Sequence, residues 1–152
     1  MKFAFALLLI ALPLAAAEQP AGSPAEDLAR IQTETNLEKR ARAALDNADD
    51  ALKRARDAYQ KGDSTEANAR LSEIEQSVVL ADESLKATHK NPSRSPKHFK
   101  QAEMRTRELL RKLDGFRDEM SVTDRPALDR VASAVQKIHD ALLDGIMGGK
   151  KK

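Results

Sequence analysis

The chain of 152 residues contains no cysteine and no tryptophan, and it has only one tyrosine. Without cysteine it can form no disulfide, carry no lipid on a cysteine and attach no haem through a Cys-x-x-Cys-His motif. Aromatic residues make up 3% of the chain, so it lacks the rings on which nucleic-acid bases stack. We therefore expect no nucleic acid among its partners.

Long apolar runs are absent beyond the first 17 residues. There, Lys2 precedes the apolar run Phe3–Leu12, and Ala15-x-Ala17 supplies small residues before Glu18. This layout is typical of a cleavable secretory signal, and the run is shorter than the roughly 20 residues of a membrane-spanning helix. We expect the protein to be exported, periplasmic or secreted, with no transmembrane segment in the mature chain.

The residues that are abundant favour helices. The composition is rich in Ala, Leu, Glu, Lys, Arg and Asp, which are mostly good helix formers. Charged residues make up 33% of the chain, yet the formal net charge is only +2. The sequence therefore predicts an all-α protein with heavily charged, solvated helix faces.

Capping signals divide the chain into helices. Ser23-Pro24-Ala25-Glu26 is a capping box with proline at the first helical position. A second box is predicted at Thr35-Asn36-Leu37-Glu38, so either one helix spans 24–61 or a short helix precedes a main one at 36–61. Gly62 supplies a left-handed C-cap, after which Asp63 begins the next helix.

Apolar residues recur at about 3.5-residue spacing in four segments, as in coiled-coil seams. The stripes are Ala41, Leu45, Ala48, Leu52, Ala55 and Tyr59; Ala67, Leu71, Ile74, Val78, Ala81 and Leu85; Phe99, Ala102, Thr106, Leu109, Leu113, Phe116 and Met120; and Leu128, Val131, Val135, Ile138, Leu142 and Ile146. We expect these ridges to meet in one dry interior. The alanine-rich first stripe predicts close packing of that helix against its neighbours.

The predicted fold is an antiparallel up-down-up-down four-helix bundle after a cleavable signal peptide. Two helical hairpins that do not close into a bundle are the structural alternative. The predicted division is 1–17 signal peptide, 18–35 N-terminal extension or short helix, 36–148 bundle domain and 149–152 basic tail.

No arrangement of residues predicts catalysis, a metal site or a cofactor. His89, His98 and His139 have neither mutual helical spacing nor a Glu three residues before them, as a metal site in a bundle needs. The first long helix, 36–61, holds no methionine for an axial haem ligand. No Gly-x-Ser-x-Gly elbow is present. We expect solvated histidines, no cofactor and a non-enzymatic protein.

Charge is distributed unevenly along the chain. Residues 86–112 carry nine bases against two acids, a net charge of +7. Residues 18–85 carry nine bases against fifteen acids, a net charge of −6. In the expected topology the loop after residue 85 and the C-terminus share one end of the bundle. Glu26 and Asp27 are expected at that end too, and Arg107 and Arg111 are expected to pair with acids of the first two long helices.

This basic end is the candidate binding site for an anionic envelope component or an acidic protein. The predicted site residues are Lys86, Lys90, Arg94, Lys97, His98 and Lys100. The alternative hypothesis is a carrier or sensor that holds a small ligand or cofactor between the helices. A surface that only keeps the protein soluble is the simplest interpretation of the same charges.

Overall fold

The computed structural model describes residues 22–148, so the predicted signal peptide, residues 1–17, and the basic tail, residues 149–152, lie outside the described residues. Within that range the protein is all-helical, with no strand. Its helices are α1 (Pro24–Gln32), α2 (Leu37–Gln60), α3 (Ser64–Ala87), α4 (Lys97–Glu119) and α5 (Arg125–Ile146). Over these same residues, none of the helices combines the length and the apolar character that crossing a membrane requires.

The short helix α1 precedes the first long helix, α2. Of the two predicted alternatives, one helix over 24–61 or a short helix before a main one, the structure has the second. α1 begins with the predicted capping box, in which Ser23 accepts from the Glu26 N–H and the Glu26 carboxylate accepts from the Ser23 N–H. The second predicted box is wrong, because the N-cap of α2 is Asn36, whose side chain accepts from the Lys39 N–H at 2.9 Å. The Glu38 carboxylate accepts instead from Lys90 Nζ.

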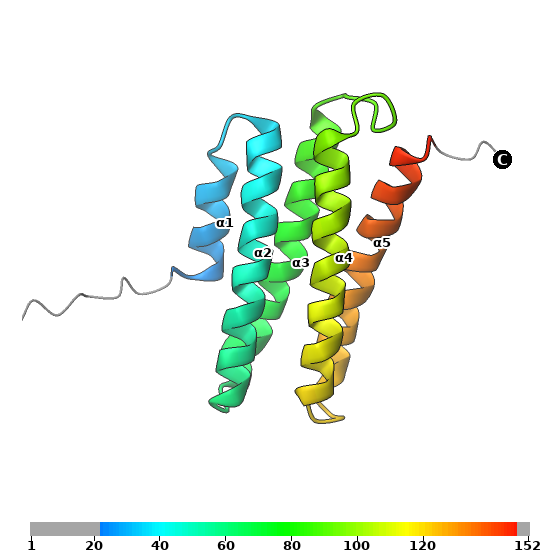
Figure 1. Cartoon of the computed structure of the whole chain (residues 1–152). Coiled ribbons are helices and arrows are strands. Elements are labelled where there is room, and N and C mark those ends of the chain that lie inside the picture. Colours follow the sequence, from blue (N-terminus) through cyan, green and yellow to red (C-terminus); the bar gives the residue numbers. More distant parts are fainter. Residues whose placement is uncertain (1–21, 149–152) are drawn as a thin grey trace, which may run out of the picture.

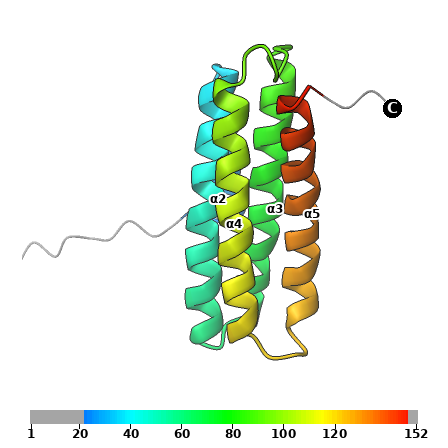
Figure 2. The same ribbon diagram turned by 45° about the vertical axis from the view of Figure 1, so that its right-hand side comes forward.

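Successive long helices run in opposite directions (Figure 1). α2 packs beside α3 and α4, and α5 packs beside the same two helices, whereas α3 and α4 touch much less. The order around the bundle is therefore α2, α3, α5, α4, in which the cross-hairpin neighbours α2 and α4 run parallel, as do α3 and α5 (Figure 2). α1 lies against α2 and α3 only.

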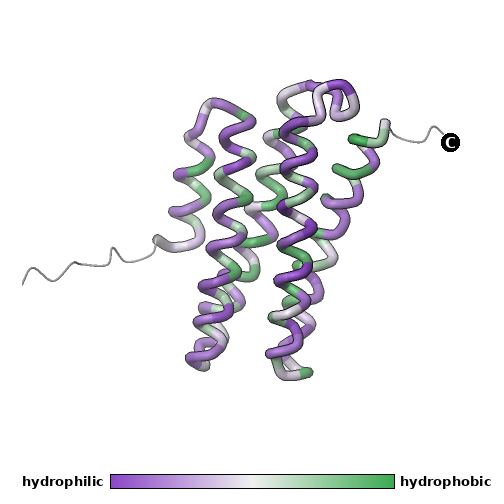
Figure 3. Tube along the Cα trace, in the orientation of Figure 1, coloured by the Kyte–Doolittle hydropathy of each residue, from purple (hydrophilic) through white to green (hydrophobic). Residues whose placement is uncertain are grey.

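The apolar stripes form the core. Hydrophobic and hydrophilic residues alternate along every helix (Figure 3), and all but three members of the four predicted stripes are buried; Tyr59, Ile138 and Ile146 pack against the core half-buried. The most extensive contact of α2 is with α3, and four of its alanines, Ala44, Ala48, Ala51 and Ala55, are fully buried. Small side chains allow this close approach, as predicted.

The interior is not entirely apolar, which corrects one expectation. Between α2 and α3, the Asn47 amide donates to Glu73 Oε1 at 2.8 Å and to Ser77 Oγ at 3.0 Å. Arg70 donates to Glu73 Oε2 at 2.8 Å and lies 3.6 Å from Asp27 of α1. All five residues are buried. These groups satisfy one another, so the cluster is stable only as a complete network.

A second polar cluster lies between α4 and α5. Thr106 Oγ1 and His139 Nδ1 are 3.2 Å apart, and His139 Nε2 lies 3.8 Å from Glu103. His139 is 9% exposed, so the prediction of a solvated histidine is wrong for this residue. His139 directly follows Ile138 of the α5 stripe, and its ring faces Thr106 and Glu103 of α4.

Candidate functional site

The α3–α4 connection, residues 88–96, is a loop closed by its own hydrogen bonds. Asn91 Oδ1 accepts from the Ser93 N–H at 3.0 Å and from Ser93 Oγ at 2.7 Å. The Ser95 N–H donates to the Asn91 carbonyl at 2.8 Å. Pro92 approaches α5 so closely that a Cβ on Gly145 would lie 3.2 Å from it. The loop therefore lies beside the C-terminal end of α5.

Glu38, in the first turn of α2, joins this loop to the bundle. Its carboxylate accepts from Lys90 Nζ at 2.6 Å and lies 3.1 Å from His98 Nε2. The hydrogen bond from Lys90, with the nearby charges of His98, Lys90 and Lys97, lowers the pKa of the Glu38 carboxyl. One acid thus holds together the α2 start, the loop and the α4 start.

Three of the six predicted site residues lie against acids. Lys86 pairs with Asp82 within α3 at 2.6 Å, and Lys90 and His98 share Glu38. For the remaining three, the residues that the structure describes offer no ion-pair partner; these three are Arg94, Lys97 and Lys100. All three are exposed. They are the cations available to a partner.

The acid that lies at the α3–α4 end of the bundle is Glu38, whereas Glu26 and Asp27 were expected there. α1 begins away from the α3–α4 loop (Figure 1), and Asp27 instead accepts from Arg54 at 2.7 Å on the α1 side of the bundle. The expectation that Glu26 and Asp27 offset the basic end is therefore wrong. α1 is too short to reach from one end to the other, and Glu38 takes that position because α2 begins there.

The start of α4 is unusual for a helix. Its N-cap is Pro96, which provides no side-chain hydrogen bond, and its first turn contains no acid. Lys97, His98 and Lys100 occupy that turn instead. Cations are unfavourable at the positive end of the helix dipole, whereas an anion is stabilised there by the free N–H groups. The cations and the dipole together make this end attractive to an anion.

An open hollow of about 480 Å³ lies at this place. It is lined by Glu38, Lys90, Ser95, Pro96, Lys97, His98 and Lys100. It is therefore shaped by the loop and the α4 start together, with two of the three unpaired cations on its wall.

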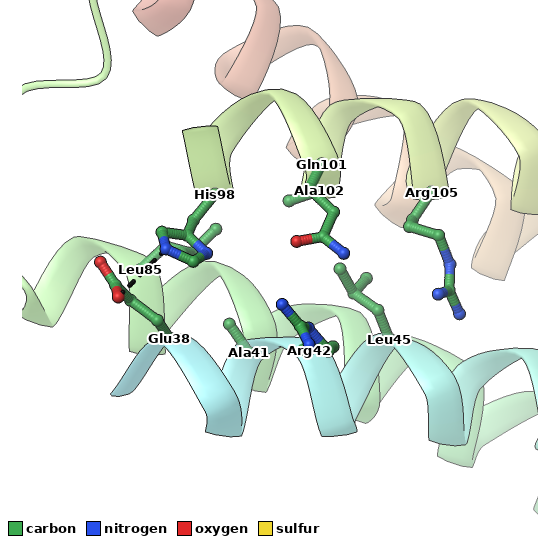
Figure 4. Close-up of a pocket in the computed structure, with 9 residues that line it drawn as sticks. All are labelled: Glu38, Ala41, Arg42, Leu45, Leu85, His98, Gln101, Ala102 and Arg105. Carbon is green, nitrogen blue, oxygen red and sulfur yellow. Dashed lines mark ion pairs between the residues drawn. The ribbon is translucent and has the colours of Figure 1, made fainter. Parts of the chain in front are cut away.

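A second, much smaller hollow lies between α2 and α4 (Figure 4). Glu38, Arg42 and Leu45 reach it from α2, and His98 and Arg105 reach it from α4. Its volume is about 10 Å³, room for no more than about one water molecule. A hollow of that size gives no support to the hypothesis of a ligand carried between the helices.

No family model, curated protein or solved structure matches this chain. The function is therefore inferred from the residues of this site. Within residues 22–148, no three His, Asp or Glu side chains are arranged to hold a metal ion.

Glu38 is the site residue that sequence reasoning missed. Its spacing from Thr35 predicts a local role in a capping box, whereas its partners Lys90 and His98 lie 52 and 60 positions further along the chain. Charge alternation gives no signal for such a distant pairing. Its place in the first turn of a helix that starts at the basic end was the one clue available.

Proposed function

We propose that this protein is an exported, non-enzymatic helical bundle that binds a phosphate-bearing component of the cell envelope through the α3–α4 end. Its partner is an anionic lipid surface or a soluble polyanion, which share the same chemistry. The binding groups are Arg94, Lys97 and Lys100, with the free N–H groups of α4.

The observation that carries the proposal is the set of cations at the start of α4. Two exposed bases, Lys97 and Lys100, lie where the helix dipole is already positive, and a third, Arg94, lies in the loop just before them. No acid of the described residues forms an ion pair with any of the three. This arrangement opposes the stability of the free protein. Local conflicts of this kind are expected at functional sites, where the partner removes them.

Glu38 supports the site by holding Lys90 and His98 in place. The α3–α4 loop is thereby fixed against α2, so binding does not have to order a free segment first. A preorganised site loses less conformational entropy on binding.

The proposal is tested with vesicles containing phosphatidylglycerol, compared with vesicles of phosphatidylcholine alone. At about 20 mM salt the protein is expected to cosediment with the anionic vesicles only. The triple variant R94Q/K97Q/K100Q is expected to bind roughly a hundredfold more weakly, because each base near an anionic surface contributes about 1 kcal/mol. Inorganic polyphosphate, added as a competitor, shows whether a soluble polymer occupies the same site.

The matched control is K53Q/K61Q, which removes two exposed bases from α2 and its C-cap, both far from the loop in the chain. This control is expected to bind like the unaltered protein. Equal binding to neutral and anionic vesicles, or unchanged binding by the triple variant, contradicts the proposal.

A further inference from the structure

An open groove lies between α1 and α3, on a part of the surface that the proposed function does not use. Its volume is about 480 Å³, and its apolar lining includes Leu28, Ala29, Val79 and Leu80. Val79 is one of the exposed large apolar side chains, at 37%. An isolated exposed valine is ordinary, but this one lies within a groove.

Two acids flank that apolar lining. Glu75 and Glu83 also line the groove, and they lie four residues before and four residues after Val79. Residues spaced by four share a helix face, so Glu75, Val79 and Glu83 form a line of about 12 Å along α3. Neither acid has an ion-pair partner within residues 22–148.

The exposed face of α4 carries the complementary pattern. Lys100, Met104, Arg107 and Arg111 recur at spacings of four, three and four, and all four are exposed. Met104 is 63% exposed, so a large apolar side chain lies in solvent between bases. Lys100 and Arg107 are about 10 Å apart along the helix, which matches the acids of the groove within the reach of their side chains.

The α4 bases that do face the bundle are different ones. Arg105 pairs with Asp46 at 2.7 Å and with Asp49 at 2.8 Å, and Lys112 pairs with Asp49 at 3.0 Å. Among residues 22–148, the ion pairs of Arg107 and Arg111 are all within α4, with Glu103 and Glu108. The expectation that Arg107 and Arg111 pair with α2 or α3 is therefore wrong, and their face of α4 is left outward.

We propose that α4 of one molecule docks in the α1–α3 groove of a second copy of this chain. Met104 packs on Val79 and Leu80 of the second copy, while Lys100 and Arg107 lie opposite Glu83 and Glu75. The charge of the chain fits this pairing, because the segment 18–85 has a net charge of −6 and the segment 86–112 a net charge of +7.

The two patches are different surfaces of the molecule, so the contact is heterologous. Each molecule that uses its α4 still has an open α1–α3 groove for the next molecule. Such head-to-tail contacts extend into rings or open chains rather than stopping at a two-fold dimer. The expected behaviour is association that grows with protein concentration.

This inference stands apart from the proposed anion site. It depends on Met104 and the groove, whereas the anion site depends on the loop and the first turn of α4. Lys100 is the one residue common to both, so the variants below leave it unaltered.

Sedimentation velocity tests the proposal on the purified protein. At about 20 mM salt the weight-average sedimentation coefficient is expected to rise with concentration, and at 500 mM salt it is expected to stay at the monomer value, because salt screens exposed charges. A monomer at all concentrations up to about 1 mM in low salt overturns the proposal.

Complementary charge reversals show where the contact lies. M104E/R111E places carboxylates on the α4 face, and E75K/E83K places bases in the groove, so each variant alone is expected to associate at least tenfold more weakly. Mixed together, the unaltered α4 face of E75K/E83K meets the unaltered groove of M104E/R111E, so pairwise association is expected to return. Far-ultraviolet circular dichroism of each variant checks that its helices remain.

Two controls make the outcome decisive. R94Q/K97Q alters the anion site but not the α4 face, so it is expected to associate like the unaltered protein. M104E/R111E is expected to keep its binding to anionic vesicles, so failure of one proposal is distinguishable from failure of the other. Association that neither reversal weakens, or a mixture that remains monomeric, overturns the inference.

Discussion

Glu73 is a carboxylate with no exposed surface in the middle of a helix–helix interface. It is tolerated because Arg70 and Asn47 donate to its two oxygens at 2.8 Å each. Arg70 in turn donates to Glu66 Oε1 and to the Gly22 carbonyl, at 2.6 and 2.9 Å. Burying an ion pair has a desolvation cost that good geometry and further hydrogen bonds offset, whereas removing one partner leaves an uncompensated buried charge and is strongly destabilising.

Removing Arg70 is therefore expected to destabilise the fold severely. R70A leaves Glu73 buried beside no cation, and the expected loss is about 3–5 kcal/mol in the free energy of unfolding. Urea denaturation followed by circular dichroism measures it. The control is K53A, which removes an exposed pair with Asp50 and is expected to cost less than about 1 kcal/mol. Similar losses in the two variants contradict this view of the buried network.

Glu38 makes the basic end sensitive to acid. Its folded-state pKa is lowered from the ordinary value of 4.5, first by the hydrogen bond from Lys90. A lowered pKa means that the ion pair stabilises the fold above the unfolded-state value and is lost as the pH falls through the folded-state value. The α3–α4 end is therefore expected to loosen on the acid side of pH 4.5.

The variant K90Q is expected to raise the pKa of Glu38 toward its ordinary value, because the largest cause of the shift is removed. A carboxyl-carbon NMR titration of Glu38 measures this pKa in both proteins. K86Q is the control, since Lys86 pairs with Asp82 rather than Glu38. A Glu38 pKa that is equal in K90Q and the unaltered protein contradicts the assignment.

Stability and binding oppose each other at the start of α4. Lys97 and Lys100 lie in a first turn without an acid or a side-chain cap. The helix dipole disfavours each such cation by about 0.3–1 kcal/mol at low salt.

The double variant K97Q/K100Q is thus expected to be as stable as the unaltered protein or up to about 1 kcal/mol more stable, while binding anionic vesicles more weakly. Thermal unfolding at low salt measures the first effect and vesicle cosedimentation the second. R107Q, which alters a base in the middle of α4, shows what the loss of a base does away from the helix terminus. A clear loss of stability in K97Q/K100Q contradicts the view that these bases serve binding.

The helices themselves were largely predictable, because capping and periodicity are local signals. Ser23, Asp63 and the four apolar stripes follow from spacing alone. The sequence alone does not decide whether α1 and α2 are separate helices, since both Thr35 and Asn36 are good N-caps. Asn36 is the N-cap in the structure, where its N–H donates to the Glu34 carboxylate at 2.9 Å.

What the sequence did not predict are the pairings between helices. Asn47, Glu73 and Ser77 each look like ordinary polar residues beside an apolar stripe, and only the close packing of α2 on α3 brings them together. The same holds for Thr106 and His139, which come from two helices 33 positions apart. The spacing of residues within one helix does not show which residues of a neighbouring helix face them.

The unequal distribution of charge over the whole molecule leaves two basic surfaces exposed. The acids of α2 pair with inward bases of α4, so the bases that remain are those of the loop, of the α4 start and of the outward α4 face. The loop end is assigned to an anionic partner and the α4 face to a second copy. Both contacts are expected to weaken with salt, because both involve exposed charges.

Arg94, Lys97 and Lys100 are proposed to bind an anionic surface. The most direct test is the salt dependence of binding to phosphatidylglycerol vesicles, measured for the unaltered protein and for R94Q/K97Q/K100Q. We predict that the affinity of the unaltered protein falls steeply between 20 and 200 mM salt, and that the triple variant shows little binding and little salt dependence. An affinity that does not change with salt, or a variant whose curve coincides with that of the unaltered protein, contradicts the claim.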